Sequence, residues 1–166
     1  MSKLTLARRI AHYACELSFD DIPESVIACV RWRFVDSLAC ILGAYGARPV
    51  EAAIKVATQA SQLSSTVFGT DVRTTPELAA FANGIMVRFL DYNDGYMGLE
   101  PGHPSDSIPA CLALAEAEGA TGSELITAIV IAFAMTAVLL VTAVRSRSDS
   151  RSDHVDGSEP RREDRP

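Results

Sequence analysis

PESVIACVRWRFVDSLACILG, residues 23–43, carries the apolar periodicity of a long α-helix. Apolar side chains recur at helical intervals, at Val26, Ile27, Val30, Phe34, Leu38, Ile41 and Leu42. This spacing places them along one side of a helix, where they can face a core. Pro23 suits the first turn, in which a missing N–H removes no hydrogen bond, and Gly43 and Gly46 follow the apolar run. We therefore expect one long helix here.

The segments on either side also have helical patterns. Helices are predicted over residues 4–17, 50–60, 76–89, 107–118 and from 122 onwards. Thr75-Pro76 is a typical helix start, and Thr121-Gly-Ser-Glu124 is a capping box. Residues 65–69 are predicted to form a short extended segment, and no strand pattern is repeated along the sequence. The predicted fold is therefore all-α, a bundle of six or seven helices.

The composition is that of one globular domain and excludes several classes of function. Hydrophobic residues make up 48% of the 166 residues and charged residues 22%. The net charge of −6 argues against nucleic acid as a partner, because phosphate binding requires a basic surface. The four cysteines form no CxxC pair, so the sequence predicts no metal site of that kind. With no signal-peptide core before the first charges, we expect a cytoplasmic protein.

The character of the chain changes near its C-terminal end. Residues 125–144 contain no charged side chain, whereas residues 145–166 are almost wholly Arg, Ser, Asp, Glu and Pro. Such a tail cannot bury enough apolar surface to offset the entropy of ordering. We therefore predict a helical domain over residues 1–144 and a disordered tail over residues 145–166. An alternative is that residues 125–144 span a membrane, since about 20 apolar residues suffice for that.

A loop between two predicted helices contains the side chains with the most chemistry. It reads FLDYNDGY from Phe89 and EPGHPSD from Glu100. Asp91 lies at the end of one helix, and His103 stands between Pro101-Gly102 and Pro104, which restrict its backbone. Both are candidates for proton transfer. For Asp91 the competing interpretation is an ion pair with Arg88, three positions earlier.

Other residues of the loop complete the predicted site. The helix that begins near Ser105 offers free N–H groups, which could bind the carboxylate of a substrate beside His103. The predicted lining residues are Tyr92, Asn93, Tyr96 and Ser105. The loop does not fit a calcium site, because Gly95 and Tyr96 occupy the fifth and sixth positions of the EF-hand pattern and Gly102 the twelfth. We therefore predict no metal.

Three stretches of sequence resemble the start of MmgE/PrpD family proteins. They are Asp36-Ser-Leu-Ala-Cys, Ala82-Asn-Gly, and the loop with Gly102-His-Pro-Ser-Asp, and the resemblance covers roughly residues 4–132. The family includes 2-methylcitrate dehydratase, cis-aconitate decarboxylase and iminodisuccinate epimerase. The resemblance implies a cofactor-free lyase or isomerase that acts on small di- or tricarboxylic acids, usually as a homodimer. It also places Asp91 and His103 in the active site, whereas Gly95 stands where many members have threonine.

The resemblance further implies that this chain is only the N-terminal portion of a family member. Members are usually more than twice as long and have a second, α+β domain that carries further basic residues of the site. We therefore expect no activity from the chain alone, and association into a homo-oligomer or with a full-length relative. Near Phe133 the resemblance to the family fades into an apolar run and then the tail, and a frameshifted or truncated reading frame would produce such a change. A non-catalytic helical dimerisation module is a further alternative.

Overall fold

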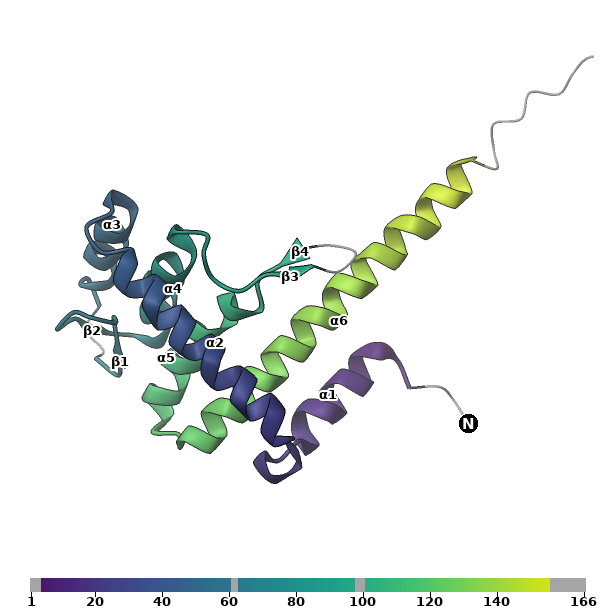
Figure 1. The fold of residues 1–166 in the computed structure, drawn as a ribbon, viewed down its shortest axis with the longest axis horizontal. Coiled ribbons are helices and arrows are strands. Elements are labelled where there is room, and N and C mark those ends of the chain that lie inside the picture. The colour runs from purple at the N-terminus through teal and green to yellow at the C-terminus, as the bar shows by residue number, and fades with distance from the viewer. Residues whose placement is uncertain (1–3, 61–62, 98–100, 156–166) are drawn as a thin grey trace, which may run out of the picture.

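The computed structural model describes residues 4–60, 63–97 and 101–155, and within them it contains six α-helices (Figure 1). The helices are α1 (Leu6–Glu16), α2 (Glu24–Gly43), α3 (Arg48–Ala57), α4 (Pro76–Phe89), α5 (Ile108–Glu118) and α6 (Gly122–Val155). Two 3-10 turns, Phe19–Asp21 and Pro104–Ser107, precede α2 and α5. The strands in this part of the chain are two residues long: β1 (Ser65–Thr66), β2 (Arg73–Thr74), β3 (Tyr96–Met97) and β4 (Pro101–Gly102). The all-α prediction is confirmed.

Both short hairpins are antiparallel. In the first, Ser65 pairs with Thr74 and Thr66 with Arg73. In the second, Tyr96 pairs with Gly102 and Met97 with Pro101. The second hairpin joins the two halves of the candidate site loop, so its pairing determines how residues 91–95 face residues 103–107.

The hydrophobic core consists of two clusters. The larger one joins the end of α2 with α3, α4 and the first hairpin, and comprises Ile41, Ala44, Val50, Ala53, Ala57, Val67, Ala82, Met86 and Val87. The smaller one joins the middle of α2 to α5 and α6 through Val30, Ile108 and Ile129. The candidate site loop runs from the end of α4 to the start of α5, and therefore begins in one cluster and ends in the other.

The buried face of α4 differs from the predicted one. Apolar residues recur at helical spacing in residues 76–89, and this spacing predicts a buried stripe of Leu78, Phe81, Ala82, Ile85, Met86 and Phe89. Phe81 and Phe89 are, however, 48% and 45% exposed. The helix instead buries Ala79, Ala82, Asn83, Met86 and Val87. Because α4 packs against both α3 and α5, small residues on the contacting faces allow a close approach that the large rings would prevent.

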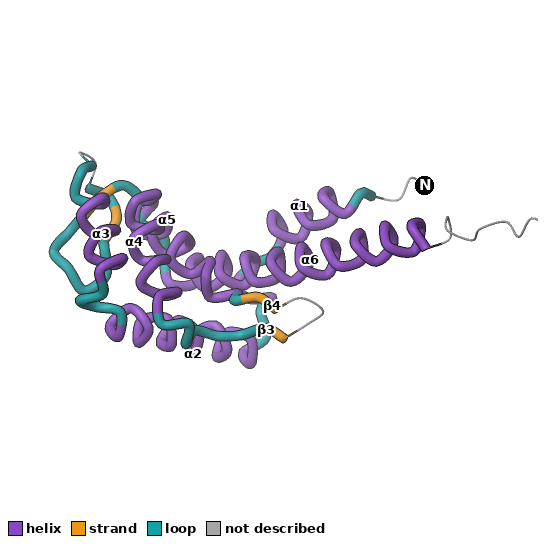
Figure 2. The backbone as a smooth tube through the Cα atoms, turned by 90° about the horizontal axis from the view of Figure 1, so that it is seen from above, coloured by secondary structure: helices purple, strands orange, loops and turns teal. Residues whose placement is uncertain are grey.

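Helix α6 is the longest helix of the described residues, and its C-terminal part extends beyond the other helices (Figures 1 and 2). Its start has the predicted capping box, in which the Thr121 N–H donates to Glu124 Oε2 at 2.7 Å and the Glu124 N–H to Thr121 Oγ1 at 3.3 Å. The helix continues past Arg145 and ends at Val155. Adding a residue to an existing helix requires only that one residue be ordered, so polar sequence can extend α6 without a core. Residues 156–166 lie outside the described residues.

The apolar part of α6 bears on the membrane alternative. The window Gly122–Leu139 is long and apolar enough to cross a membrane, and 6% of it is buried in the structure. Helix α1 lies beside this window, where Leu6, Ile10 and Tyr13 line a pocket together with Ala134, Met135 and Val138. The helix is therefore partly covered by protein, and less deeply buried than a core helix.

The buried amide of Asn83 gives a test of this packing. Asn83 Oδ1 accepts from the Phe68 N–H at 2.9 Å, and Asn83 Nδ2 donates to Thr66 O at 3.0 Å. We expect Asn83→Ala to lower the free energy of unfolding by about 1–3 kcal/mol, because both backbone groups lose their partner. Urea unfolding followed by circular dichroism measures the change. The control is Gln59→Ala, which removes an exposed amide and should change stability by less than about 0.5 kcal/mol. Equal effects of the two variants would contradict the structure.

Candidate active site

Asp91 leaves α4 through a left-handed backbone conformation. Its φ is +56°, and it is the one non-glycine residue with positive φ in the described part of the chain. Aspartate tolerates this region better than most residues do. The conformation turns the chain sharply after Leu90, the C-cap of α4, and this turn brings the Asp91 carboxylate back toward Arg88 and across to His103.

The Asp91 carboxylate contacts two cationic or basic groups. Arg88 Nη1 donates a hydrogen bond to Asp91 Oδ1, and His103 Nε2 lies 3.9 Å from the same oxygen. The pKa of Asp91 is lowered, and the largest cause is the hydrogen bond from Arg88, followed by the positive charge of Arg88. Desolvation opposes the shift, and the charge of His103 adds a smaller lowering of the pKa. The predicted pair with Arg88 and the proximity to His103 are therefore both present. At neutral pH Asp91 is a carboxylate.

The ring of His103 is oriented by one hydrogen bond. Its Nδ1 lies 2.7 Å from the backbone carbonyl oxygen of Asp94. Since a carbonyl oxygen can only accept, Nδ1 carries the proton in this contact and Nε2 of the neutral ring has a free lone pair. His103 has φ −120° and lies directly before Pro104, which agrees with the extended backbone predicted for it. The free nitrogen thus faces the Asp91 carboxylate.

Asp94 occupies the place that the sequence predicts for a substrate carboxylate. Its side chain is 7% exposed, Oδ1 accepts from the Ser105 N–H at 3.0 Å, and Oδ2 accepts from Arg33. The prediction that these N–H groups are free for a substrate is therefore wrong at Ser105. The loop carries its own anion, and Asp94 satisfies the start of the 3-10 turn that leads into α5.

The four predicted lining residues fall into two pairs. Asn93 and Ser105 are 5% and 0% exposed, and Asn93 Nδ2 donates to Ser105 Oγ and to Asp106 Oδ1, both at 3.0 Å. They lie beneath the loop and connect its two halves. Tyr92 and Tyr96 are 81% and 41% exposed and lie on its solvent side. The structure thus brings the six predicted residues into one loop, while only some of them face solvent.

Two arginines complete the cluster. Arg88 is also 3.8 Å from Asp106 through Nε, in addition to its pair with Asp91. Arg33 comes from α2, 61 positions before its partner Asp94, and no local sequence signal connects the two residues. The sequence predicts only that Arg33 lies in the long helix of residues 23–43. Within the described residues, no three His, Cys, Asp or Glu side chains come together as potential metal ligands.

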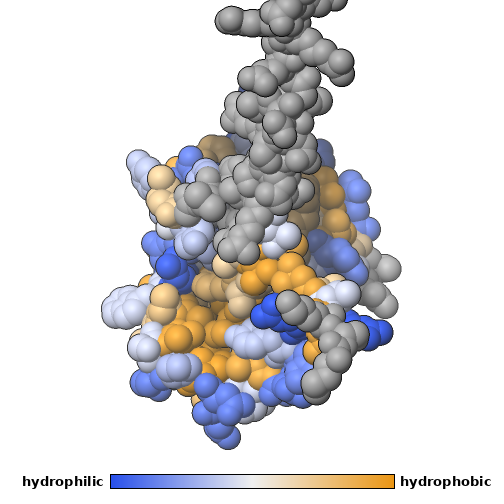
Figure 3. Space-filling view, turned by 90° about the vertical axis from the view of Figure 1, so that its right-hand side faces the viewer, coloured by the Kyte–Doolittle hydropathy of each residue, from blue (hydrophilic) through white to orange (hydrophobic). Residues whose placement is uncertain are grey.

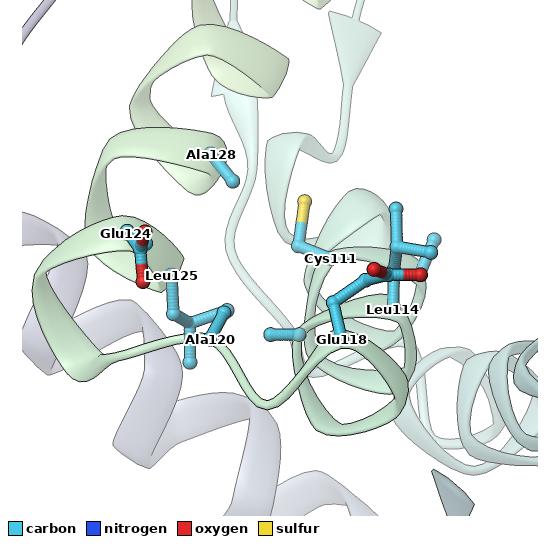
Figure 4. Close-up of a pocket in the computed structure, with 9 residues that line it drawn as sticks. Cys111, Leu114, Glu118, Ala120, Glu124, Leu125 and Ala128 are labelled. Carbon is cyan, nitrogen blue, oxygen red and sulfur yellow. The ribbon is translucent and has the colours of Figure 1, made fainter. Parts of the chain in front are cut away.

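A separate apolar pocket of about 420 Å³ lies between α5 and α6 (Figure 4). Cys111, Leu114 and Leu125 line it, and Glu118 and Glu124 also border it. Burial raises the pKa of the Cys111 thiol, so the thiol is protonated at neutral pH, although a backbone hydrogen bond partly opposes the shift. Two carboxylates and a protonated thiol suit neither a carboxylate substrate nor nucleophilic chemistry. The loop of Asp91 and His103 is the better candidate.

Comparison with known proteins agrees with the loop motif. The family model described as the MmgE/PrpD N-terminal domain matches residues 8–156. This chain belongs to the MmgE/PrpD family. The match extends well past residue 132, where the sequence resemblance was expected to end, and it includes α6. The predicted departure from the family near Phe133 stays a prediction.

The similar curated proteins are citrate-type dehydratases. A probable 2-methylcitrate dehydratase of Saccharomyces cerevisiae is 36% identical over 88 residues, which cover 52% of this chain and 17% of that protein. An alkylcitrate dehydratase of a fungal species is 31% identical over 108 residues, 63% of this chain and 21% of the relative. The 2-methylcitrate dehydratase of Escherichia coli is 46% identical over 48 residues, which cover 29% of this chain and 10% of that protein. This chain thus spans about a fifth or less of the relatives it matches.

The Arg88–Asp91 contact predicts a pH dependence. Arg88→Met should raise the pKa of Asp91 toward its ordinary value of 3.8, because the largest cause of the lowered pKa is removed. With the pKa lowered in the folded chain, ionised Asp91 stabilises the fold above pH 3.8, and this contribution is lost as the pH falls through the folded value. Carboxyl NMR titration measures the pKa.

The matched control is Arg48→Met, which removes an exposed arginine from α3. It should leave the titration of Asp91 unchanged. If Asp91 titrates identically in the Arg88 variant and in the unmodified chain, the ion pair does not exist in solution.

Proposed function

We propose that this chain supplies part of the active site of a lyase that dehydrates 2-methylcitrate or a related alkylcitrate. His103 is the proton acceptor, and Asp91 stabilises the imidazolium that results. The observation that carries this proposal is the orientation of His103, whose Nδ1 is bonded to Asp94 O while Nε2 faces Asp91. The names of the relatives from yeast, a fungal species and Escherichia coli support the choice of substrate.

The proposed step requires one base and one departing hydroxyl group. Dehydration of a β-hydroxy acid breaks a C–H bond next to a carboxylate and a C–O bond on the adjacent carbon, forms a C=C bond and expels hydroxide, which takes a proton from solvent to become water. His103 Nε2 takes the proton, and its neutral form is the competent one. The carboxylate of Asp91, 3.9 Å from Nε2, can pair with the imidazolium that forms. We propose that side chains alone perform this step, without a cofactor.

The charges of the loop support a site that needs a further surface. A di- or tricarboxylate substrate requires cationic partners, but Arg88 is paired with Asp91 and Asp106, and Arg33 with Asp94. These three carboxylates outnumber the two guanidinium groups. A substrate anion would meet net negative charge here. We therefore propose that cations outside the described residues bind the substrate, and that the chain alone does not turn over.

The exposure of the loop supports the same proposal. Asp91 is 70% exposed, and Met97 and Tyr92 are 88% and 81% exposed. Proton transfer in such a site benefits from exclusion of water. The face at the end from which α6 projects also shows a broad area of apolar side chains (Figure 3), a feature typical of interaction surfaces. We propose that a second copy of the chain, or a full-length relative, covers the loop.

The activity test uses a chimera. In the yeast relative, the segment that corresponds to residues 8–156 of this chain, the span of the family match, is replaced by those residues. Formation of the conjugated double bond from 2-methylcitrate is then followed by absorbance. We expect turnover by the chimera, and a loss of about 10²–10⁴-fold on His103→Gln, the range for a general base. His12→Gln, in an exposed pair with Glu16 on α1, is the matched control and should have no effect.

Two outcomes would contradict the proposal. Turnover by the unmodified chain alone would show that the loop needs no further surface. Full activity of a His103→Gln chimera would remove the histidine from the mechanism. Undiminished binding of substrate by that variant is expected, because His103 is assigned proton transfer and not substrate recognition.

A second candidate function, a membrane-associated protein, is favoured by the apolar window of α6. We propose instead that its exposed side packs against protein and that the chain is cytoplasmic, with no nucleic acid partner. The relative from Yarrowia lipolytica is named a mitochondrial 2-methylcitrate dehydratase. In detergent phase separation we expect the chain in the aqueous phase. Recovery in the detergent phase, together with a marker membrane protein, would favour the alternative.

A further inference from the structure

We propose that Arg33 is a positioning residue for His103 and acts through Asp94. This inference rests on the proposed function of His103, but it concerns the proton on the imidazole and can be tested without turnover. Arg33 lies on α2, and its guanidinium contacts the Asp94 carboxylate and not the histidine itself. The effect passes from the side chain of Asp94 to its backbone carbonyl, which binds His103 Nδ1.

Asp94 connects these groups through three contacts. Oδ2 accepts from Arg33, Oδ1 accepts from the Ser105 N–H at 3.0 Å, and the backbone oxygen lies 2.7 Å from His103 Nδ1. Its side chain is 7% exposed, whereas that of Asp91 is 70% exposed. A buried carboxylate with both oxygens engaged has little freedom to move. The position of its carbonyl is therefore determined by the partners of its side chain.

Arg33 also contacts an aromatic ring on α6. Its guanidinium carbon lies 5.9 Å from the centre of the Phe133 ring on α6, a cation–π distance. Phe133 packs against the core cluster of Val30, Ile108 and Ile129. The arginine thus connects that cluster to the loop. Arg88 also has several partners, Asp91, Asp106 and Asn93, but among the described residues its guanidinium has no cation–π contact with an aromatic ring.

The consequence concerns the tautomer of the neutral ring. A free imidazole can carry its proton on either nitrogen, but only the form protonated at Nδ1 can donate to Asp94 O and leave Nε2 available as a base. Arg33 keeps Asp94 O in place and thereby favours that form. Without Arg33, the buried carboxylate has only the Ser105 N–H, and we expect the loop to rearrange to solvate it.

The test is ¹⁵N NMR of the histidine rings at a pH where the rings are neutral. The signals of His103 are assigned by their absence in His103→Gln. In the unmodified chain we expect the Nδ1–H form to predominate, and in Arg33→Met we expect this predominance to be lost. Methionine keeps most of the aliphatic stem and removes the charge. Arg31→Met, two positions away on α2 and exposed in a 3.6 Å pair with Glu24, is the matched control and should leave the tautomer unchanged.

Arg33→Lys provides a second variant in case Arg33→Met does not fold, as judged by circular dichroism. Lysine keeps the charge but not the planar geometry of the guanidinium, so we expect a smaller loss of the Nδ1–H form. The proposal is overturned if a folded Arg33 variant shows the same tautomer as the unmodified chain. It is also overturned if Arg31→Met changes the tautomer equally. If the Arg33 variants change the tautomer as expected but the chimera is inactive, the proposed function is contradicted and the role of Arg33 is not.

Discussion

Asp94 has a buried carboxylate whose charge must be balanced, and α2 supplies the balancing cation through Arg33. Burying one charge alone costs several kcal/mol, so the two residues must come together for this packing to form. The pair joins the long helix α2 to a loop that follows α4, and Ser105 joins the same carboxylate to the start of α5. The Asp94 carboxylate thus ties the loop both to α2 and to the start of α5. The orientation of His103 follows from it.

The exposed and buried parts of the loop have different tasks. Asn93, Ser105 and the side chain of Asp94 are buried and make hydrogen bonds that connect residues 91–95 to residues 103–107. Asp91, Tyr92 and Tyr96 project into solvent. A catalytic side chain needs a rigid support because small displacements of a base reduce its efficiency. The buried layer provides this support while the exposed layer remains free to meet a substrate or another protein surface.

The helices could be predicted from sequence because their signals are local. Apolar spacing, the capping threonines at 75 and 121, and the glycines that follow α2 and α5 depend only on neighbouring residues. The site loop was found for a similar reason, since Asp91, His103 and two prolines lie within a short segment. Which face of α4 is buried could not be predicted. That helix is apolar on several sides, and its contacts with α3 and α5 determine which side chains are covered.

The sequence by itself determined the class of fold, the position of the candidate site and the two side chains suited to proton transfer. The reason is that helix periodicity, caps and proline constraints act over a few residues. The tertiary structure alone decided that Asp94 fills the anion position at Ser105, that Asn93 and Ser105 are buried, and that Arg33 belongs to the site. These facts depend on contacts between residues far apart in the chain, and Arg33 and Asp94 lie 61 positions from each other. No local pattern can specify such a contact, because it forms only when packing brings α2 against the loop.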